Sequence, residues 1–385
     1  MRYAVLLLIF AALLSGSGNA DWLPSVPSNF RVEPAADVPG ARAIAITPDG
    51  TLIAGTRSGD VYAVSDVENT KPASARVVAH FDDPPASGVA YANSTVYIGT
   101  QNAVWALSYA HGKFGKPHKL TSVRQGSPPS GSDGDVHTTT SVAASGKHVY
   151  ASVGSSCNAC VETDPSRATI GSVENGRYTV MAKRVRNAIA LTVNDATGSL
   201  WAGVSGEDDL PAGHPYEFLD DVSAYRGVAD YGWPFCYENR RSNPVPAWAG
   251  KSCAGTAVPR VVFPAYETPT AAVFYPQHAR GKYAFPATYA GGAFVALHGS
   301  WHGPAQGLSG YLPPRVVFVP MHGDSPVHAV NWSDPSAQWV EFASGYQQGG
   351  SAHRNGRPAG LAVGPQGDLF IADDMNAKIY RVRPH

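Results

Sequence analysis

The sequence predicts an all-β protein, a six-bladed β-propeller with loop insertions on one face. One phrase of two or three short strands recurs six times along the chain. Alternation of apolar and polar residues dominates after the first twenty residues, whereas helical periodicity of any length is scarce. The chain also has 40 glycines and 31 prolines, as many short strands joined by tight turns require.

The clearest copies of the phrase stand near the two ends of the chain. Ala43–Val64 reads AIAITPDGTLIAGTRSGDVYAV and Gly360–Val382 reads GLAVGPQGDLFIADDMNAKIYRV. Looser copies lie between them, at Ser87–Leu107, Thr140–Gly154, Ala188–Val204 and Thr270–Leu297. Neighbouring early copies start about 45 to 55 residues apart, which is the scale of a four-stranded propeller blade.

The two ends of the chain are expected to share one blade, because the last copy stops three residues before the C-terminus. Closing the ring in this way hides sheet edges that would otherwise pair with other chains. The spacing opens to more than 80 residues after the fourth copy and again after the fifth. Loops are expected there, and loops on a rigid scaffold often carry function.

The first twenty residues are expected to be a cleaved signal peptide. Arg2 gives a positive start, Ala4–Leu14 is apolar, and small residues up to Ala20 precede the expected cleavage site. The apolar run is shorter than the roughly 20 residues of a membrane-spanning helix, so no stable membrane insertion is expected. Residues 21–385 would then form a single domain of a periplasmic or secreted protein.

The four cysteines indicate two disulfides in such an exported protein. Three pairings are possible, and we favour Cys157–Cys160 with Cys236–Cys253 because each pair closes a short loop. A c-type haem site would need histidine at position 161, where valine stands, and a thioredoxin-like motif would need a βαβ pattern. The formal charge of −1 argues against nucleic acid as a partner.

Three polar residues lie directly before repeat strands. His137 ends a Gly/Ser/Pro-rich loop before the third copy, and a histidine there can act as a general base. Arg186 and Asn187 lead into the fourth copy, offering a planar cation and an amide. A surface histidine and a solvated basic turn remain open alternatives.

The segment Ser205–Glu217 is acidic and rich in glycine and proline. Carboxylates and exposed carbonyl oxygens are what Ca²⁺ prefers as ligands, although the spacing is no EF-hand. Gly206, Glu207 and Asp208 are the candidate metal-binding residues.

Further candidates follow or precede the last strands. His298 comes after the strand of the fifth copy, and Arg354 and Arg357 lie before the sixth. Equivalent positions of different blades converge on one mouth of a ring. Arginines, histidines and an asparagine beside an acidic loop would form a pocket for a polyanionic ligand with a metal ion. The sequence contains no nucleophile elbow, P-loop or His-Glu-x-x-His motif.

Together these motifs resemble the soluble quinoprotein sugar dehydrogenases, also called the glucose/sorbosone dehydrogenase family, and most closely its sorbosone dehydrogenase branch. The resemblance runs in family order over roughly residues 40 to 383. Besides the histidine, arginine and asparagine motifs above, it includes Gly154–Asn158, Gly232–Pro234, Leu297–Trp301 and the pair Asp373 and Asp374.

The resemblance implies that the propeller holds pyrroloquinoline quinone (PQQ) over its central channel with Ca²⁺ beside it. His137 matches the family's general base, which takes a proton from a sugar C1 hydroxyl or a hydrated aldehyde while hydride passes to the quinone. Arg186 and Asn187 match the pair that contacts PQQ. Val136 stands where better-known glucose dehydrogenases carry an aspartate.

The remaining implied roles concern the cofactor's charge. Arg357 and Arg354 stand where the family places arginines near the PQQ carboxylates, and His298 stands in the region of a family lysine. Gly206, Glu207 and Asp208 match the loop that presents Ca²⁺ ligands. A separate electron acceptor is expected, because the sequence has no haem motif.

Two other functions remain open at this stage. One is a Ca²⁺-dependent propeller hydrolase of the lactonase kind, which would hold its metal mainly with carboxylates and asparagine. The other is a non-catalytic binding propeller, in which the residues at the mouth would be interchangeable.

Overall fold

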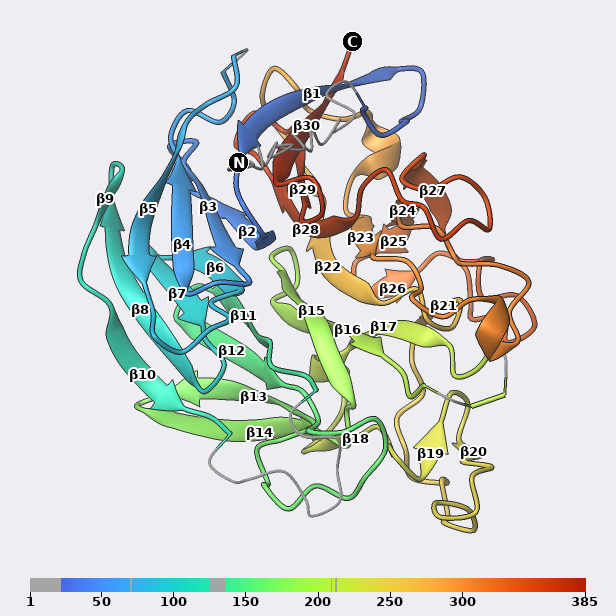
Figure 1. Ribbon diagram of the computed structural model, residues 1–385. Helices are drawn as coiled ribbons and strands as arrows, with labels where there is room; N and C mark the ends of the chain where they lie inside the picture. Colours follow the sequence, from blue (N-terminus) through green and yellow to red (C-terminus); the bar gives the residue numbers. More distant parts are fainter. Residues whose placement is uncertain (1–21, 70, 125–135, 209, 212) are drawn as a thin grey trace, which may run out of the picture.

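The structure, a computed structural model, describes residues 22–69, 71–124, 136–208, 210–211 and 213–385. Over these residues the chain forms six sheets of four or five strands, arranged as blades around a central axis (Figure 1). The predicted six-bladed propeller is therefore confirmed. The predicted signal peptide lies outside the described residues.

The first three blades follow one another along the chain. Blade 1 contains β2 (Ala41–Ile46), β3 (Leu52–Thr56), β4 (Asp60–Val64) and β5 (Ala75–His80). Blade 2 contains β6 (Gly88–Ala92), β7 (Thr95–Gly99), β8 (Ala103–Ala110) and β10 (His118–Ser122), with β9 (Lys113–Phe114) paired to β8. Blade 3 contains β11 (Thr140–Ser145), β12 (His148–Val153), β13 (Thr169–Glu174), β14 (Arg177–Lys183) and the parallel β18 (Ala229–Asp230).

The last three blades complete the ring. Blade 4 contains β15 (Asn187–Asn194), β16 (Ser199–Ser205), β17 (Glu217–Asp221) and β21 (Val261–Phe263). Blade 5 contains β22 (Pro269–Phe274), β23 (Ala293–Leu297), β24 (Arg315–Val319) and β27 (Val340–Ala343). Blade 6 contains β28 (Pro358–Val363), β29 (Leu369–Asp373), β30 (Lys378–Pro384) and β1 (Phe30–Asp37).

Ring closure takes the form that the sequence predicts. The N-terminal strand β1 pairs antiparallel with the C-terminal strand β30, from Phe30 opposite Pro384 to Asp37 opposite Lys378. In Figure 1 the blue β1 accordingly lies along the red β30. Each of the six sequence copies contains the inner two or three strands of one blade.

Side-chain size explains the position of the innermost strands. These strands, which include β2 (ARAIAI), β11 (TSVAAS) and β22 (PTAAVF), are rich in alanine. Small residues let six strands converge around one axis, and each innermost strand contacts the next. Larger apolar residues pack between the blades, in six clusters that each join two neighbouring blades. A seventh, small cluster contains Cys157, Ala168 and Trp233.

The long insertions contain short hairpins. One is β19 (Cys236–Tyr237) with β20 (Arg241–Ser242), and the other is β25 (Met321–His322) with β26 (Ser325–Pro326). The only helices among the described residues are the 3₁₀ turns η1 (Val222–Ala224), η2 (Ala287–Tyr289) and η3 (Pro304–Gln306). No helix in the described part of the chain has the length and apolarity needed to cross a membrane. Both predicted disulfides, Cys157–Cys160 and Cys236–Cys253, are present.

Candidate active site

The strand order explains why distant residues meet at one mouth of the ring. The start of an innermost strand and the end of its antiparallel neighbour lie at the same edge of a blade. His137 precedes β11, Arg186 precedes β15 and Arg357 precedes β28, while Gly206 follows β16 and His298 follows β23. All five are therefore delivered to the same edge.

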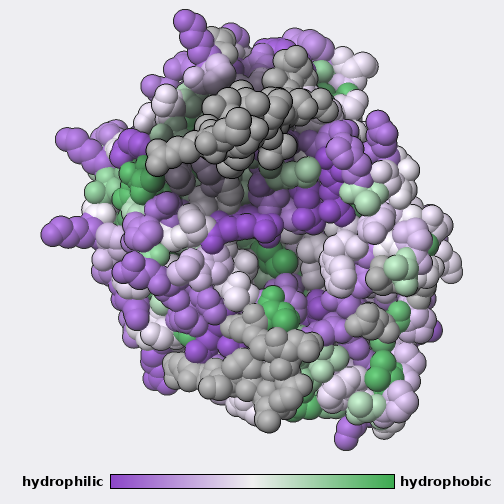
Figure 2. Space-filling view, in the orientation of Figure 1, coloured by the Kyte–Doolittle hydropathy of each residue, from purple (hydrophilic) through white to green (hydrophobic). Residues whose placement is uncertain are grey.

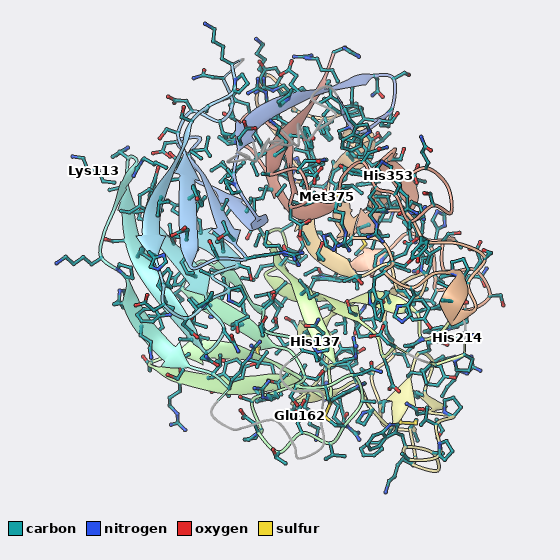
Figure 3. The ribbon with its side chains drawn as sticks, viewed as in Figure 1. Lys113, His137, Glu162, His214, His353 and Met375 are labelled. Atoms are coloured by element: carbon teal, nitrogen blue, oxygen red, sulfur yellow. A yellow bond between two sulfur atoms is a disulfide. The ribbon has the colours of Figure 1, made fainter. Side chains whose placement is uncertain are left out.

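A pocket of about 260 Å³ lies at this mouth. Of the predicted site residues it is lined by His137, Arg186, Asn187, Gly206, Asp208, His298 and Arg357. Thr270 borders both this pocket and a cavity of about 600 Å³ that the innermost strands of all six blades line, so the pocket stands at one end of the central channel. Figure 3 places His137 beside β15 in the lower half of the ring, and Figure 2 shows a band of hydrophilic residues next to a few hydrophobic ones across the middle of this face.

Gly154 allows two of these residues to approach each other. It follows β12, and a β-carbon at this position would lie 2.6 Å from His137 Cβ and 2.8 Å from Asn187 Oδ1. Any larger residue would therefore collide with both. Glycine at position 154 is a steric requirement for packing the candidate base against the candidate cofactor-binding amide.

Hydrogen bonds fix the tautomer of His137. Its Nδ1 lies 2.9 Å from the carbonyl oxygen of Ser155 and 2.9 Å from the Ser155 hydroxyl, which itself donates to the carbonyl of Cys157. Both Ser155 oxygens are acceptors in this arrangement, so Nδ1 carries the proton and Nε2 carries the lone pair. Burial and the charge of Arg186 hold the pKa of His137 well below its usual value. The imidazole is therefore neutral, with Nε2 as its basic atom.

Three hydrogen bonds anchor the guanidinium of Arg186. Its Nε donates to the carbonyl of Asn158 at 3.0 Å, and its Nη2 donates to Asn158 Oδ1 and to Asp208 Oδ2, both at 2.9 Å. The side chain is 7% exposed. These contacts hold the guanidinium at the pocket wall.

The predicted metal loop is brought to the pocket only in part. Gly206 and Asp208 line it, but the buried Glu207 carboxylate accepts a hydrogen bond from Asn243 Nδ2 at 3.0 Å, and Glu207 lines a neighbouring cavity instead. Glu217, which the sequence did not single out, lies beside the loop and accepts hydrogen bonds from the main-chain N–H groups of Gly206 and Tyr266. Burial raises the pKa of Glu217 to about 8.

His298 belongs to a charged network that the sequence analysis did not predict. Its Nε2 lies 3.0 Å from Asp374 Oδ1, while Arg42 Nη1 and Arg57 Nη2 donate to Asp374 Oδ2 at 2.6 and 2.8 Å. Although burial opposes it, the His298 hydrogen bond and the charge of Arg42 hold the pKa of Asp374 well below its usual range. Burial lowers the pKa of His298 to about 3, so a neutral imidazole donates to an ionised carboxylate.

The two predicted arginines before β28 occupy different places. Arg357 lines the pocket, and its Nε donates to the carbonyl of His298 at 3.1 Å. Arg354 is not among the lining residues, because its Nη2 donates to the carbonyl of Ser300 and its Nε to Gln347. Burial and the neighbouring charge of Arg354 lower the pKa of Arg357 to about 10. Within the described chain, no carboxylate forms an ion pair with Arg357.

Some pocket residues were missed by the sequence analysis although a signal existed. Arg42 directly precedes the first copy, and Arg186 and Arg357 were singled out because they lie within three residues before later copies. The other lining residues that were not singled out lie at strand ends or in connections of variable length: Arg57, Ser205, Glu217, Tyr266, Thr268 and Thr270. Their position relative to the repeat carried no comparable signal.

Fold and pocket together define a six-bladed propeller with a cationic site at the mouth of its channel. The sequence profile of the TrAA12-like family matches residues 24–385. The chain belongs to the TrAA12-like family.

Solved structures share this fold. A Trichoderma reesei carbohydrate-active enzyme of family AA12, in an iodide and a calcium structure, superposes with a TM-score of 0.75 at 17% identity; the iodide match covers 94% of this chain and 98% of that chain. The holo form of the pyranose dehydrogenase PQQ domain from Coprinopsis cinerea gives 0.74 at 18% identity, over 94% and 97%. An uncharacterised protein of Borreliella burgdorferi is 22% identical over 371 residues, 93% of this chain and 90% of that protein.

Proposed function

We propose that this protein is a PQQ- and Ca²⁺-dependent sugar dehydrogenase in which His137 is the general base. The observation that carries the proposal is the joint presence, in one pocket, of four arginines and a neutral histidine whose Nε2 has no hydrogen-bond partner among the described residues. Two similar structures are named for a PQQ domain and for calcium. Membership of the TrAA12-like family supports proposing the same ligands for this chain.

The charges of the pocket suit an anionic cofactor. Arg42, Arg57, Arg186 and Arg357 surround it, and the lowered pKa of Arg357 reflects burial and mutual repulsion among arginines. A planar guanidinium binds a carboxylate with two parallel hydrogen bonds. PQQ carries three carboxylates, so it would relieve this repulsion.

The oxygen atoms at the pocket suit a hard divalent cation. Gly206, Asp208 and Glu217 all line the pocket, and their carbonyl and carboxylate oxygens are the ligands that Ca²⁺ prefers. A cation there would also offset the charge of Glu217, which burial otherwise disfavours.

In this proposal the residues of the pocket have separate roles, as base or as ligand-orienting groups. When bound, PQQ supplies a two-electron acceptor, and the protein contributes orientation and electrostatics. His137 Nε2 takes the proton of the substrate hydroxyl, because Nδ1 is already occupied by Ser155. Asn187 and Arg186 orient the ligand from the start of β15.

The finer assignments belong to the same proposal. The substrate is a sugar or an aldehyde of the aldose or sorbosone type, oxidised at a C1 hydroxyl or at a hydrated aldehyde. Electrons leave to a separate acceptor, and the protein acts in the periplasm or outside the cell. The two disulfides are consistent with an oxidising compartment.

A metal-dependent hydrolase fits the pocket less well. Such a site holds its metal mainly with carboxylates and asparagine, but four arginines and two histidines line this pocket, and the Asp374 carboxylate is held by Arg42, Arg57 and His298. Burying charged groups costs free energy, and a non-catalytic propeller would gain nothing that offsets this cost.

Reconstitution tests the proposal. The purified ligand-free protein is mixed with PQQ and Ca²⁺, and reduction of a dye acceptor is followed with a panel of aldoses and aldehydes. His137→Ala should lower turnover by about 100-fold or more while PQQ binding stays close to that of the wild type. Absence of both dye reduction and PQQ binding in the wild type would reject the function, and unchanged turnover in His137→Ala would reject the base.

A further inference from the structure

We propose that Asn158, held in the loop that the Cys157–Cys160 disulfide closes, is the positioning residue that fixes Arg186 and residues 206–208 at the pocket. This inference rests on the proposed function, since it names what holds the ligand-binding groups in place. Asn158 does not line the pocket itself. Its role is therefore exerted through its neighbours.

The local sequence makes this loop rigid. The disulfide closes a ring over only two intervening residues, and Cys157 is 3% exposed. Cys157 and Cys160 pack against Ala168 and Trp233 in a small apolar cluster beside the site. Trp233 Nε1 also donates to the carbonyl of Asn158 at 3.1 Å, so the main chain at residue 158 is held from two sides.

Both oxygens of Asn158 accept hydrogen bonds from site residues. Its side-chain Oδ1 accepts from Arg186 Nη2 at 2.9 Å and from the main-chain N–H of Asp208 at 2.8 Å. Its carbonyl oxygen accepts from Arg186 Nε at 3.0 Å. Arg186 therefore uses two of its nitrogens on one residue, which fixes the plane of the guanidinium.

A further hydrogen bond, donated by the side-chain nitrogen of Asn158, fixes the orientation of the amide. Asn158 Nδ2 donates to the main-chain oxygen of Asp208 at 3.2 Å. The side chain thus pairs with both the N–H and the C=O of Asp208, as one strand pairs with another. Segment 206–208 is the candidate cation-binding loop, so a single amide links the predicted anion-binding and cation-binding parts of the site.

Removing this amide should weaken both the anion-binding and the cation-binding part of the site. Loss of partners that orient ligating groups typically costs about 10- to 100-fold in affinity. We expect Asn158→Ala to raise the Kd for PQQ in the presence of Ca²⁺ by about 10-fold or more, measured by titration of the full-length ligand-free protein. The Tm of the variant is measured in parallel.

A matched control separates positioning from general stability. Asn194 is 4% exposed and lies at the far end of β15 from the pocket. Its Nδ2 donates to the carbonyl of Gly323 and to Asp324, and its Oδ1 accepts from the N–H of Ala196. Asn194→Ala should lower Tm without a comparable change in Kd.

The two disulfides allow a second, independent test. The variant C236S/C253S retains only the Cys157–Cys160 bridge, and C157S/C160S retains only the other. The disulfides are reduced with tris(2-carboxyethyl)phosphine, which is removed without air before PQQ is added because phosphines react with quinones. Reduction should raise the Kd of C236S/C253S by about 10-fold, and it should leave the Kd of C157S/C160S unchanged. The opposite pattern, or equal Kd values for Asn158→Ala, Asn194→Ala and wild type, would overturn the proposal.

A readout without ligand keeps this inference separate from the proposed function. Amide hydrogen exchange at residues 205–208 should be faster in Asn158→Ala than in the wild type and unchanged in Asn194→Ala. If the wild type binds no PQQ, the function fails and this measurement alone decides the role of Asn158. Wild-type exchange at residues 205–208 in Asn158→Ala would refute the positioning role.

Discussion

Gly154→Ala inserts one methyl group between the candidate base and the residue beside it. The new β-carbon would stand 2.6 Å from His137 Cβ, 2.8 Å from Asn187 Oδ1 and 3.3 Å from the carbonyl oxygen of His137. Carbon atoms in ordinary contact are about 3.5 to 4.0 Å apart. His137, Asn187 or both must therefore move by about 1 Å.

The expected loss of activity follows from that displacement. A 1 Å misplacement of a group at the reacting centre can lower a rate by about 100-fold. Overpacking typically costs about 1 to 3 kcal/mol of stability, so the variant should still fold. We expect kcat to fall by about 100-fold and Tm to fall by a few degrees.

The assay is dye-linked turnover of the PQQ- and Ca²⁺-loaded protein, with Tm measured on the same samples. Gly255→Ala is the matched control, because Gly255 has an ordinary φ and its β-carbon would meet nothing within 4 Å. The control should match the wild type. Wild-type kcat in Gly154→Ala would refute the close packing of His137 and Asn187 around residue 154.

Further predictions concern the charged groups. Arg357→Gln should weaken PQQ binding more than Arg357→Lys does, and equal Kd values in a titration would contradict the anion-binding role. Asp374→Asn leaves three donors without their carboxylate and should lower the free energy of unfolding by about 3 kcal/mol, which denaturant unfolding measures. Because burial and Arg186 lower its pKa, His137 in the ligand-free protein should stay neutral at pH 6.0, and an NMR titration showing an imidazolium there would contradict the tautomer argument. Glu267 lies between β21 and β22, and its buried carboxylate accepts a hydrogen bond from Arg315 Nη2 at 2.6 Å. Burial outweighs that contact and raises the pKa of Glu267 to about 7, so the folded protein binds more protons than the unfolded chain between about pH 4 and 7. Its contribution to stability is therefore lost as pH rises through that window, and Glu267→Gln should flatten the dependence of Tm on pH; an unchanged slope would be the contrary result.

The architecture was predictable because each blade repeats one local pattern. Ala43–Val64 and Gly360–Val382 spell out inner strands with their turns, and these became β2–β4 and β28–β30. The outer strands were less visible. β5, for example, is largely exposed and has little alternation, so its position depends on pairing with β4 rather than on its own sequence.

Those site residues that lie directly before a repeated strand could be predicted from the sequence, and the others could not. His137, Arg186 and Arg357 enter innermost strands, so their convergence follows from the ring. Glu217 reaches the pocket from the third strand of blade 4. Asp374 lies in the turn after the second strand of blade 6 and contacts lining residues of the pocket. The partners of Asp374 come from blades 1 and 5, and those of Glu217 lie in the loops after β16 and β21 of its own blade. Both arrangements depend on tertiary geometry that local spacing does not encode.

The acidic loop shows another limit of sequence reasoning. Gly206, Glu207 and Asp208 are consecutive, yet the Glu207 side chain turns to Asn243 whereas Asp208 turns to Arg186. Neighbouring side chains of an extended segment point to opposite sides. Which of two adjacent carboxylates faces the pocket becomes clear only when the partner residues are placed.

The central claim is that the cationic pocket at the mouth of the channel binds PQQ together with Ca²⁺. Titrating PQQ into the ligand-free protein, with Ca²⁺ or with a chelator, and following the absorbance of the cofactor tests it most directly. We expect saturable binding of one PQQ per chain with Ca²⁺, and weaker binding with the chelator or in Arg357→Gln. Absence of saturable binding in the presence of Ca²⁺ would contradict the claim.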